Sequence, residues 1–224
     1  MPGGRRKLPV LAAVAGPADG DTRAWSLQRA DLEALTKLQQ GLDDHRAVLV
    51  VGAEALAGAI ALAGAAAAAG RRTALLECDL ARPRAAAELG LRPEPGLHEY
   101  LRWEATAAEI LQPLALAGPA AKGADNPLVC VVAGRAAADA PTLAKLESFR
   151  HAIAKLRAAY ELVVLVGPPL EVAHGLPEIV AAHADVVLAA VPREGLAGQP
   201  GRLLRAQVRR LPAAALGALL VGAE

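Results

Sequence analysis

Short apolar runs alternate along this chain with longer segments in which apolar residues recur every three or four positions. Such alternation predicts strands and helices in turn, as in a parallel α/β sheet. The predicted strands are Ala47–Val51, Thr73–Glu77, Leu128–Val132, Leu162–Val166, Val186–Val191 and Leu216–Val221. The predicted helices are Asp31–Leu42, Glu54–Ala69, Arg82–Leu89, Thr106–Leu111, Thr142–Ala159, Pro177–His183 and Gly201–Leu211. Most strands are apolar throughout, which favours a doubly wound α/β fold with a mostly parallel sheet and helices on both faces.

The length of 224 residues fits one domain with a single core. Residues 1–30 are expected to form a poorly ordered N-terminal extension, because Met1–Thr22 is rich in glycine and proline and is expected to fray. Leu114–Asn126 is expected to be a connection. Residues 31–224 are then expected to form the single folded domain.

Charge and composition exclude several classes of function. The net charge is +1 and the basic residues are scattered, so nucleic acid is not an expected partner. Ala55–Ala69 is too short to span a bilayer, and Leu8–Ala15 is short for the apolar region of a signal peptide. Cys78 and Cys130 lack metal-ligand spacing and are interpreted as buried hydrophobes. We expect a cytoplasmic protein with no membrane span and no metal site.

Three blocks that cover most of the chain resemble one known family. The first runs over Gly70–Pro83 and continues in the same order and spacing to Tyr100–Leu101. The second is Tyr160–Pro169, and the third is Asp185–Val191 followed by Leu216–Leu220. Together they resemble the bacterial tyrosine kinases (BY-kinases) of exopolysaccharide synthesis, relatives of the partition and septum-positioning ATPases. The resemblance implies a P-loop NTPase-like fold.

The phosphate-binding loop of that family is degenerate in this chain. Such a loop needs glycines for close backbone approach, a lysine for the phosphates and a hydroxyl for Mg²⁺. Here Gly52 follows the first predicted strand, and the resemblance aligns Ala55 with the lysine and Leu56 with the hydroxyl residue. Residues 38–72 contain no lysine, serine or threonine, so no other register restores the motif. Glu54 adds a negative charge, and we expect ATP and Mg²⁺ binding to be weak or absent.

The acidic residues of the family are also reduced. Its metal-holding aspartate at the end of the fourth predicted strand falls on Val166, and its aspartate pair falls on Glu77 and Asp79. These two acids are the residual candidates for a metal or base site, or else they are a strand-end acid and a helix cap near Arg82. Without a phosphate loop opposite them, the structural interpretation is favoured. The site is therefore expected to have no catalytic residue and no cation that could meet a triphosphate.

The other candidates for chemistry are dispersed. The histidines, including His98 and His174, are interpreted as surface or capping residues, and Trp25 and Trp103 are interpreted as packing residues. The only tyrosines, Tyr100 and Tyr160, lie inside the family blocks, so no tyrosine tail is available for phosphorylation. The helix that links subunits in the family carries Glu33, Thr36 and Gln39 at the matching positions here, which puts ring formation by that route in doubt.

These observations lead to one main hypothesis and two alternatives. The main hypothesis is a catalytically inactive BY-kinase-like pseudo-ATPase, a regulatory or scaffold component of exopolysaccharide biosynthesis and export. The resemblance implies that its partner is the cytoplasmic part of a membrane polysaccharide co-polymerase, which would recruit it to the inner membrane. A second copy or an intact paralogue is a further partner left open. The alternatives are an ATP-binding tyrosine autokinase that uses Glu77 and Asp79, and a relative of the partition and positioning ATPases.

Overall fold

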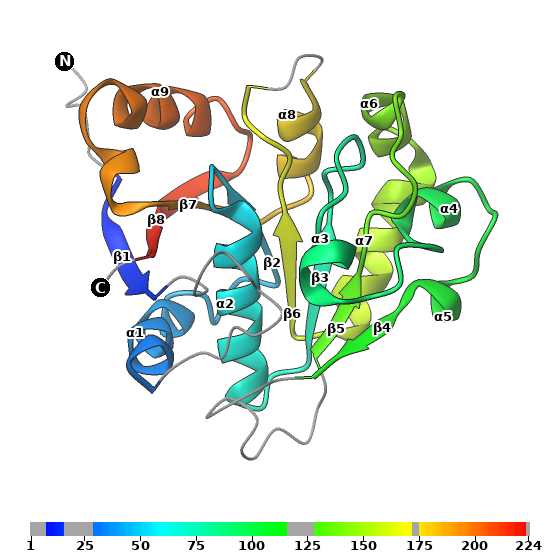
Figure 1. Ribbon diagram of the computed structural model, residues 1–224, viewed down its shortest axis with the longest axis horizontal. Coiled ribbons are helices and arrows are strands. Elements are labelled where there is room, and N and C mark those ends of the chain that lie inside the picture. The colour runs from blue at the N-terminus through cyan, green and yellow to red at the C-terminus, as the bar shows by residue number, and fades with distance from the viewer. Residues whose placement is uncertain (1–7, 16–28, 116–127, 172–174, 223–224) are drawn as a thin grey trace.

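The fold is built around one eight-stranded sheet, shown in Figure 1. The computed structural model describes residues 8–15, 29–115, 128–171 and 175–222. The strand order is β1-β8-β7-β2-β6-β3-β5-β4, and every pair is parallel except β4 with β5. The strands are β1 (Val10–Val14), β2 (Ala47–Val51), β3 (Thr73–Glu77), β4 (Gln112–Leu114), β5 (Leu128–Val131), β6 (Leu162–Val166), β7 (Val186–Val191) and β8 (Ala214–Val221). The predicted α/β class with a mostly parallel sheet is confirmed.

Helices cover both faces of this sheet (Figure 1). On one face lie α1 (Arg29–Gln40), α2 (Ala55–Ala68) and α3 (Ala85–Leu89). The core on the other face takes residues from α4 (Leu97–Leu101), α5 (Ala107–Ile110), α6 (Ala140–Ala144), α7 (Glu147–Ala159), α8 (Leu176–Ala181) and α9 (Gly198–Val208), and a 3₁₀ turn, η5 (Arg193–Leu196), precedes α9. Within the described ranges, no helix has the length and apolarity needed to cross a bilayer.

The central strands are apolar at every position because each of their faces is buried. In β2, Val48 and Val50 pack into the core beneath α1 and α2. Leu49 and Val51 point to the opposite core. Alternate residues of a strand point to opposite faces, so a strand covered on both sides needs no polar position.

Helix α2 is unusual because it has almost no polar face. Its residues from Ala55 to Ala67 are buried with the exception of Ile60, which is half-buried. Helices that are apolar all round are core helices. Small side chains bring it close to the sheet: a Cβ added to Gly58 would lie 2.5 Å from the Cβ of Ala190 in β7. The alanine tract is therefore a tightly packed helix, as predicted.

The first strand corrects the expectation for the N-terminal segment. Residues 10–14 do not fray, because β1 pairs in parallel with β8 and its Ala12 and Val14 are buried. The N–H of Ala15 then donates a hydrogen bond of 2.8 Å to Asp31 Oδ1 at the start of α1. The sheet thus begins before residue 31. Residues 1–7 and 16–28 lie outside the described residues.

Two further elements were not expected from the sequence. Strand β4 is a short antiparallel edge strand that contains Pro113, and α4 begins at Leu97, directly after Gly96. The single helix predicted over Thr142–Ala159 is instead two helices, α6 and α7, which meet at Lys145 and Leu146. Pro141 favours an early start for the first of them, because proline is tolerated in the first turn of a helix.

Candidate functional site

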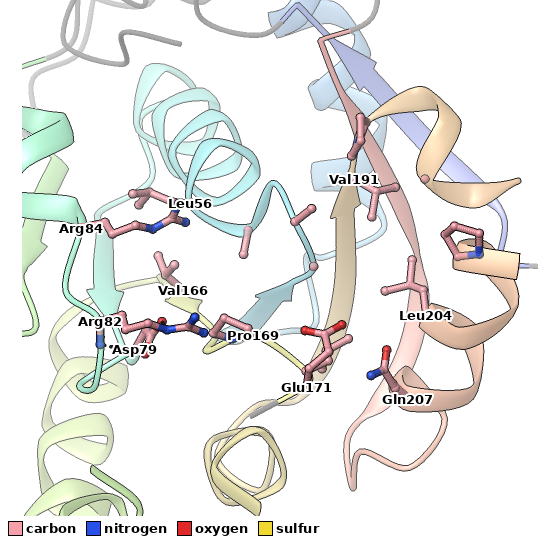
Figure 2. A pocket seen from close by; sticks show the side chains of 18 of the residues that line it. Leu56, Asp79, Arg82, Arg84, Val166, Pro169, Glu171, Val191, Leu204 and Gln207 are labelled. Carbon is pink, nitrogen blue, oxygen red and sulfur yellow. Dashed lines mark hydrogen bonds and ion pairs between the residues drawn. The ribbon is translucent and has the colours of Figure 1, made fainter. Parts of the chain in front are cut away.

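A cavity of about 520 Å³ lies where the carboxyl ends of β2, β3, β6 and β7 meet, and Figure 2 shows it from close by. In open parallel sheets this edge is where ligands bind. The structure brings every predicted site position to the wall of this one cavity: Gly52, Ala55, Leu56, Glu77, Asp79 and Val166. The remaining walls come from the β6–α8 connection, from η5 and from α9.

The loop between β2 and α2 is a tight turn in which the N–H groups of Glu54 and Ala55 donate to protein carbonyl oxygens. Gly52 has φ +110°, and a Cβ there would lie 2.5 Å from the carbonyl oxygen of Ala190. The N–H of Glu54 donates to that same oxygen at 3.0 Å, and the N–H of Ala55 donates to the Gly52 oxygen at 3.2 Å. A phosphate loop works by presenting such N–H groups to the ligand. Here the N–H of Ala55 is used inside the turn and the N–H of Glu54 is used by β7.

The floor of the cavity offers no ligand to a magnesium ion. Leu56 and Val166 are both buried and both line the cavity. Neither side chain has an oxygen atom, and Mg²⁺ is held by oxygen ligands. The residues present at the phosphate-loop and metal positions therefore do not fit Mg-ATP.

Glu77 is committed to the protein backbone. Its Oε1 accepts hydrogen bonds from the N–H groups of Arg84 (2.6 Å) and Ala85 (2.9 Å), and its Oε2 accepts one from Ala133 (2.9 Å). Only 2% of the residue is exposed. The carboxylate therefore ties the β3–α3 loop to the end of β5, which is a structural role.

Asp79 caps a turn. Its Oδ1 accepts a hydrogen bond from the N–H of Arg82 at 3.2 Å, and its Oδ2 lies 3.8 Å from the Arg82 Nε. Burial raises the pKa of Asp79, although the guanidinium and N–H of Arg82 oppose that shift. It is not the helix cap that the sequence suggested, because α3 begins only at Ala85 and its N-cap is Arg84.

Two arginines in the cavity wall were missed by the sequence analysis. Arg82 and Arg84 line the cavity, and Figure 2 shows their side chains reaching into it from the β3–α3 loop. Their side chains are 60% and 58% exposed. The expectation of a missing cation concerns the ends of β2 and β6 and does not consider the β3–α3 loop, which brings these two arginines to the cavity. The sequence shows the Arg82-Pro83-Arg84 triplet three residues after Asp79, but not that its loop reaches the cavity.

Two of the other candidate residues, His98 and Trp103, do not line this cavity. His98 is buried in a hydrogen-bond network, with Nδ1 2.6 Å from the Arg135 oxygen and Nε2 accepting from Arg102 Nε at 2.8 Å. Trp103 is 80% exposed at φ +64°, so the packing interpretation is wrong for it. Trp25 and His174 lie outside the described residues.

The buried thiols and the acids do not assemble a metal site in the part of the chain that the structure describes. Cys78 and Cys130 are free and buried, and burial raises the pKa of both thiols well above the ordinary value. Among the described residues, no three His, Cys, Asp or Glu side chains come together in a way that could hold a metal ion.

Comparison with known proteins identifies relatives by structure only. No family model matches the sequence, and no curated protein matches it significantly. The chimeric protein CapA2B2 superposes with a TM-score of 0.78 at 16% identity, over 96% of this chain and 95% of that chain. The kinase domain of the Escherichia coli tyrosine kinase ETK superposes with a TM-score of 0.74 at 15% identity, over 97% and 91%.

A third solved structure extends the likeness beyond the kinases. The septum site-determining protein MinD of Pyrococcus horikoshii, complexed with Mg-ADP, has a TM-score of 0.53 at 15% identity, over 78% of this chain and 69% of that one. The chain therefore has the fold shared by bacterial tyrosine kinase domains and MinD-type P-loop ATPases, as the sequence resemblance implied.

Proposed function

We propose that this protein is a catalytically inactive relative of the BY-kinases that serves as a regulatory or scaffold component of exopolysaccharide biosynthesis and export. One observation carries the proposal: the fold is kept, while the loop at the phosphate position turns the N–H groups of Glu54 and Ala55 inward. Leu56 and Val166 stand beside that turn without a hydroxyl or a carboxylate.

The magnitudes support a large loss of nucleotide affinity. A hydrogen bond to a charged group contributes about 1.5–3 kcal/mol, and about 1.4 kcal/mol corresponds to a tenfold change in affinity. Removal of the lysine, the hydroxyl and the metal acid together weakens Mg-ATP binding by roughly 10³-fold or more. Phosphoryl transfer depends even more strongly on the lysine and the metal, so turnover is negligible.

Isothermal titration with Mg-ATP tests this proposal. We expect no binding in the micromolar range for the natural chain. We also expect none after the double substitution Ala55→Lys and Leu56→Thr, because the turn still directs the Glu54 N–H to Ala190. Micromolar binding by the natural chain would contradict the proposal. Incorporation of radiolabelled phosphate that Asp79→Ala abolishes would favour the autokinase alternative.

The partner proposed from the resemblance is the cytoplasmic part of a membrane polysaccharide co-polymerase, with the protein itself cytoplasmic and recruited to the inner membrane. Co-purification of a tagged chain with that part, in the absence of nucleotide, is the expected result. A fluorescent fusion should follow the co-polymerase at the membrane. Localisation at the cell poles that is independent of the co-polymerase would instead support the positioning alternative.

A further inference from the structure

We propose that the cavity binds a phosphate ester through Arg82 and Arg84 without a divalent metal ion. This inference rests on the proposed function, because it concerns the same cavity once Mg-ATP is excluded from it. The two guanidinium groups replace, from the β3–α3 loop, the positive charge that the β2–α2 loop lacks.

The two arginines are positioned to receive an anion. Both side chains are more than half exposed and reach into the cavity in Figure 2, on the side where Leu56 and Val166 form the floor. Their ionic neighbours are Asp79 and Glu88, each at 3.8 Å, which is longer than a good N–H···O hydrogen bond. One guanidinium group can donate two parallel hydrogen bonds to two oxygens of a phosphate, which makes arginine well suited to phosphate recognition.

The carboxylates of the cavity are held in different ways, and Asp79 pairs with Arg82, so an anion would have to share that guanidinium with it. Glu77 is held by three backbone N–H groups, and Asp79 is turned to Arg82. The third acid, Glu171, is exposed and belongs to the β6–α8 connection beyond Pro169, on another wall of the cavity from the β3–α3 loop (Figure 2). A carboxylate there can accept hydrogen bonds from hydroxyl groups on the body of a ligand.

The remaining wall suits the body of a small ligand. Helix α9 contributes Pro200, Leu203 and Leu204 together with the amide of Gln207. Leu203 is an exposed apolar side chain, which a ligand in the cavity would cover. Mostly apolar pockets of roughly 300–1,000 Å³ with a few polar groups are typical of small-molecule sites. The ligand class is therefore a phosphate ester whose body carries hydroxyl groups, such as a nucleoside monophosphate or a sugar phosphate.

Titration with adenosine 5′-monophosphate and, separately, with glucose 1-phosphate tests the inference, each in EDTA and in excess Mg²⁺. We expect at least one probe to bind in EDTA with no gain from Mg²⁺, and the probe that binds identifies the source of the phosphate. Arg82→Gln and Arg84→Gln should each weaken binding about tenfold or more, as expected for a lost charged hydrogen bond. Melting temperatures check that each variant is folded.

Arg202→Gln is the matched control, because Arg202 is exposed on α9 and does not line the cavity. It removes the same charge and should leave binding unchanged. The inference is overturned if neither probe binds, if binding requires Mg²⁺, or if the control weakens binding as much as Arg84→Gln does. Absence of binding by both probes leaves the proposed function intact, whereas micromolar Mg-ATP binding overturns the proposed function itself.

Discussion

At the scale of single residues, Glu77 illustrates how an acid retained from a catalytic pattern can become structural. The resemblance aligns it with an aspartate. Here both of its oxygens accept backbone hydrogen bonds, from the β3–α3 loop and from Ala133 beyond β5. The β3–α3 loop, and with it Arg84, is therefore held in place by the buried side chain of Glu77.

Glu77→Gln should destabilise the fold by about 2 kcal/mol, because an amide nitrogen would face a backbone N–H and leave a buried donor unsatisfied. Urea unfolding followed by circular dichroism measures this loss. A change in unfolding free energy of less than a few tenths of a kcal/mol would show that the Glu77 carboxylate does not hold the β3–α3 loop to the end of β5.

Asp79→Asn is the informative contrast. Burial raises the pKa of Asp79, so its ionisation costs stability as the pH rises from the ordinary aspartate pKa through the raised value in the folded chain. The asparagine oxygen can still accept the Arg82 N–H. We therefore expect unfolding free energy at neutral pH to be unchanged or higher than for the natural chain. A loss as large as that of Glu77→Gln would contradict this account.

At the scale of elements, the contact between α2 and β7 depends on side-chain size. Gly58→Ala should destabilise the fold by about 1–3 kcal/mol through overpacking against Ala190, although alanine is the better helix former. Combining Gly58→Ala with Ala190→Gly removes the clash. The double variant should therefore lose less unfolding free energy than the two single variants lose together. Thermal unfolding of the four proteins measures the coupling, and strict additivity would contradict the contact.

The elements also show what sequence can predict. The bounds of β2, β3, β6 and β7 agree with the prediction to the residue, because strands buried on both faces are mostly apolar runs, with polar residues only at the two ends of β3. The edge strands β1 and β4 escaped prediction, since β1 buries only alternate residues beside a Gly- and Pro-rich segment and β4 contains a proline.

The part of the site that lies at the strand ends was also predictable from the sequence. Positions at the end of a strand or shortly after it, such as Val166 and Leu56, are located once the strand is predicted. Arg82 and Arg84 meet them only through the three-dimensional approach of the β3–α3 loop to the cavity, which no spacing in the sequence encodes.

At the scale of the whole molecule, the two edges of the sheet have different roles. The carboxyl edge is open around the cavity, whereas Asp185 closes the amino edge. Its Oδ2 accepts the N–H groups of Arg46 and Ala47 at 2.8 Å each, and its Oδ1 accepts from the Arg157 guanidinium at 2.8 Å. One carboxylate thus joins the starts of β2 and β7 to helix α7.

This arrangement predicts a pH-dependent contribution to stability that is separate from ligand binding. Burial raises the pKa of Asp185, but hydrogen bonds from Ala47, Arg157 and Arg46 outweigh it and hold the pKa below its ordinary value. The contribution of Asp185 to the free energy of unfolding is therefore present above the ordinary aspartate pKa. It is lost as the pH falls through the lower pKa that Asp185 has in the folded chain. Asp185→Asn should cost about 1–2 kcal/mol at neutral pH and clearly less at an acidic pH below the ordinary aspartate pKa, as measured by urea unfolding. Asp139→Asn, which loses a single exposed pairing with Arg102, should cost much less. An equal loss of unfolding free energy at both pH values would contradict the role of the ionised carboxylate. Phosphate-ester binding should be the same in both variants, because neither residue lines the cavity.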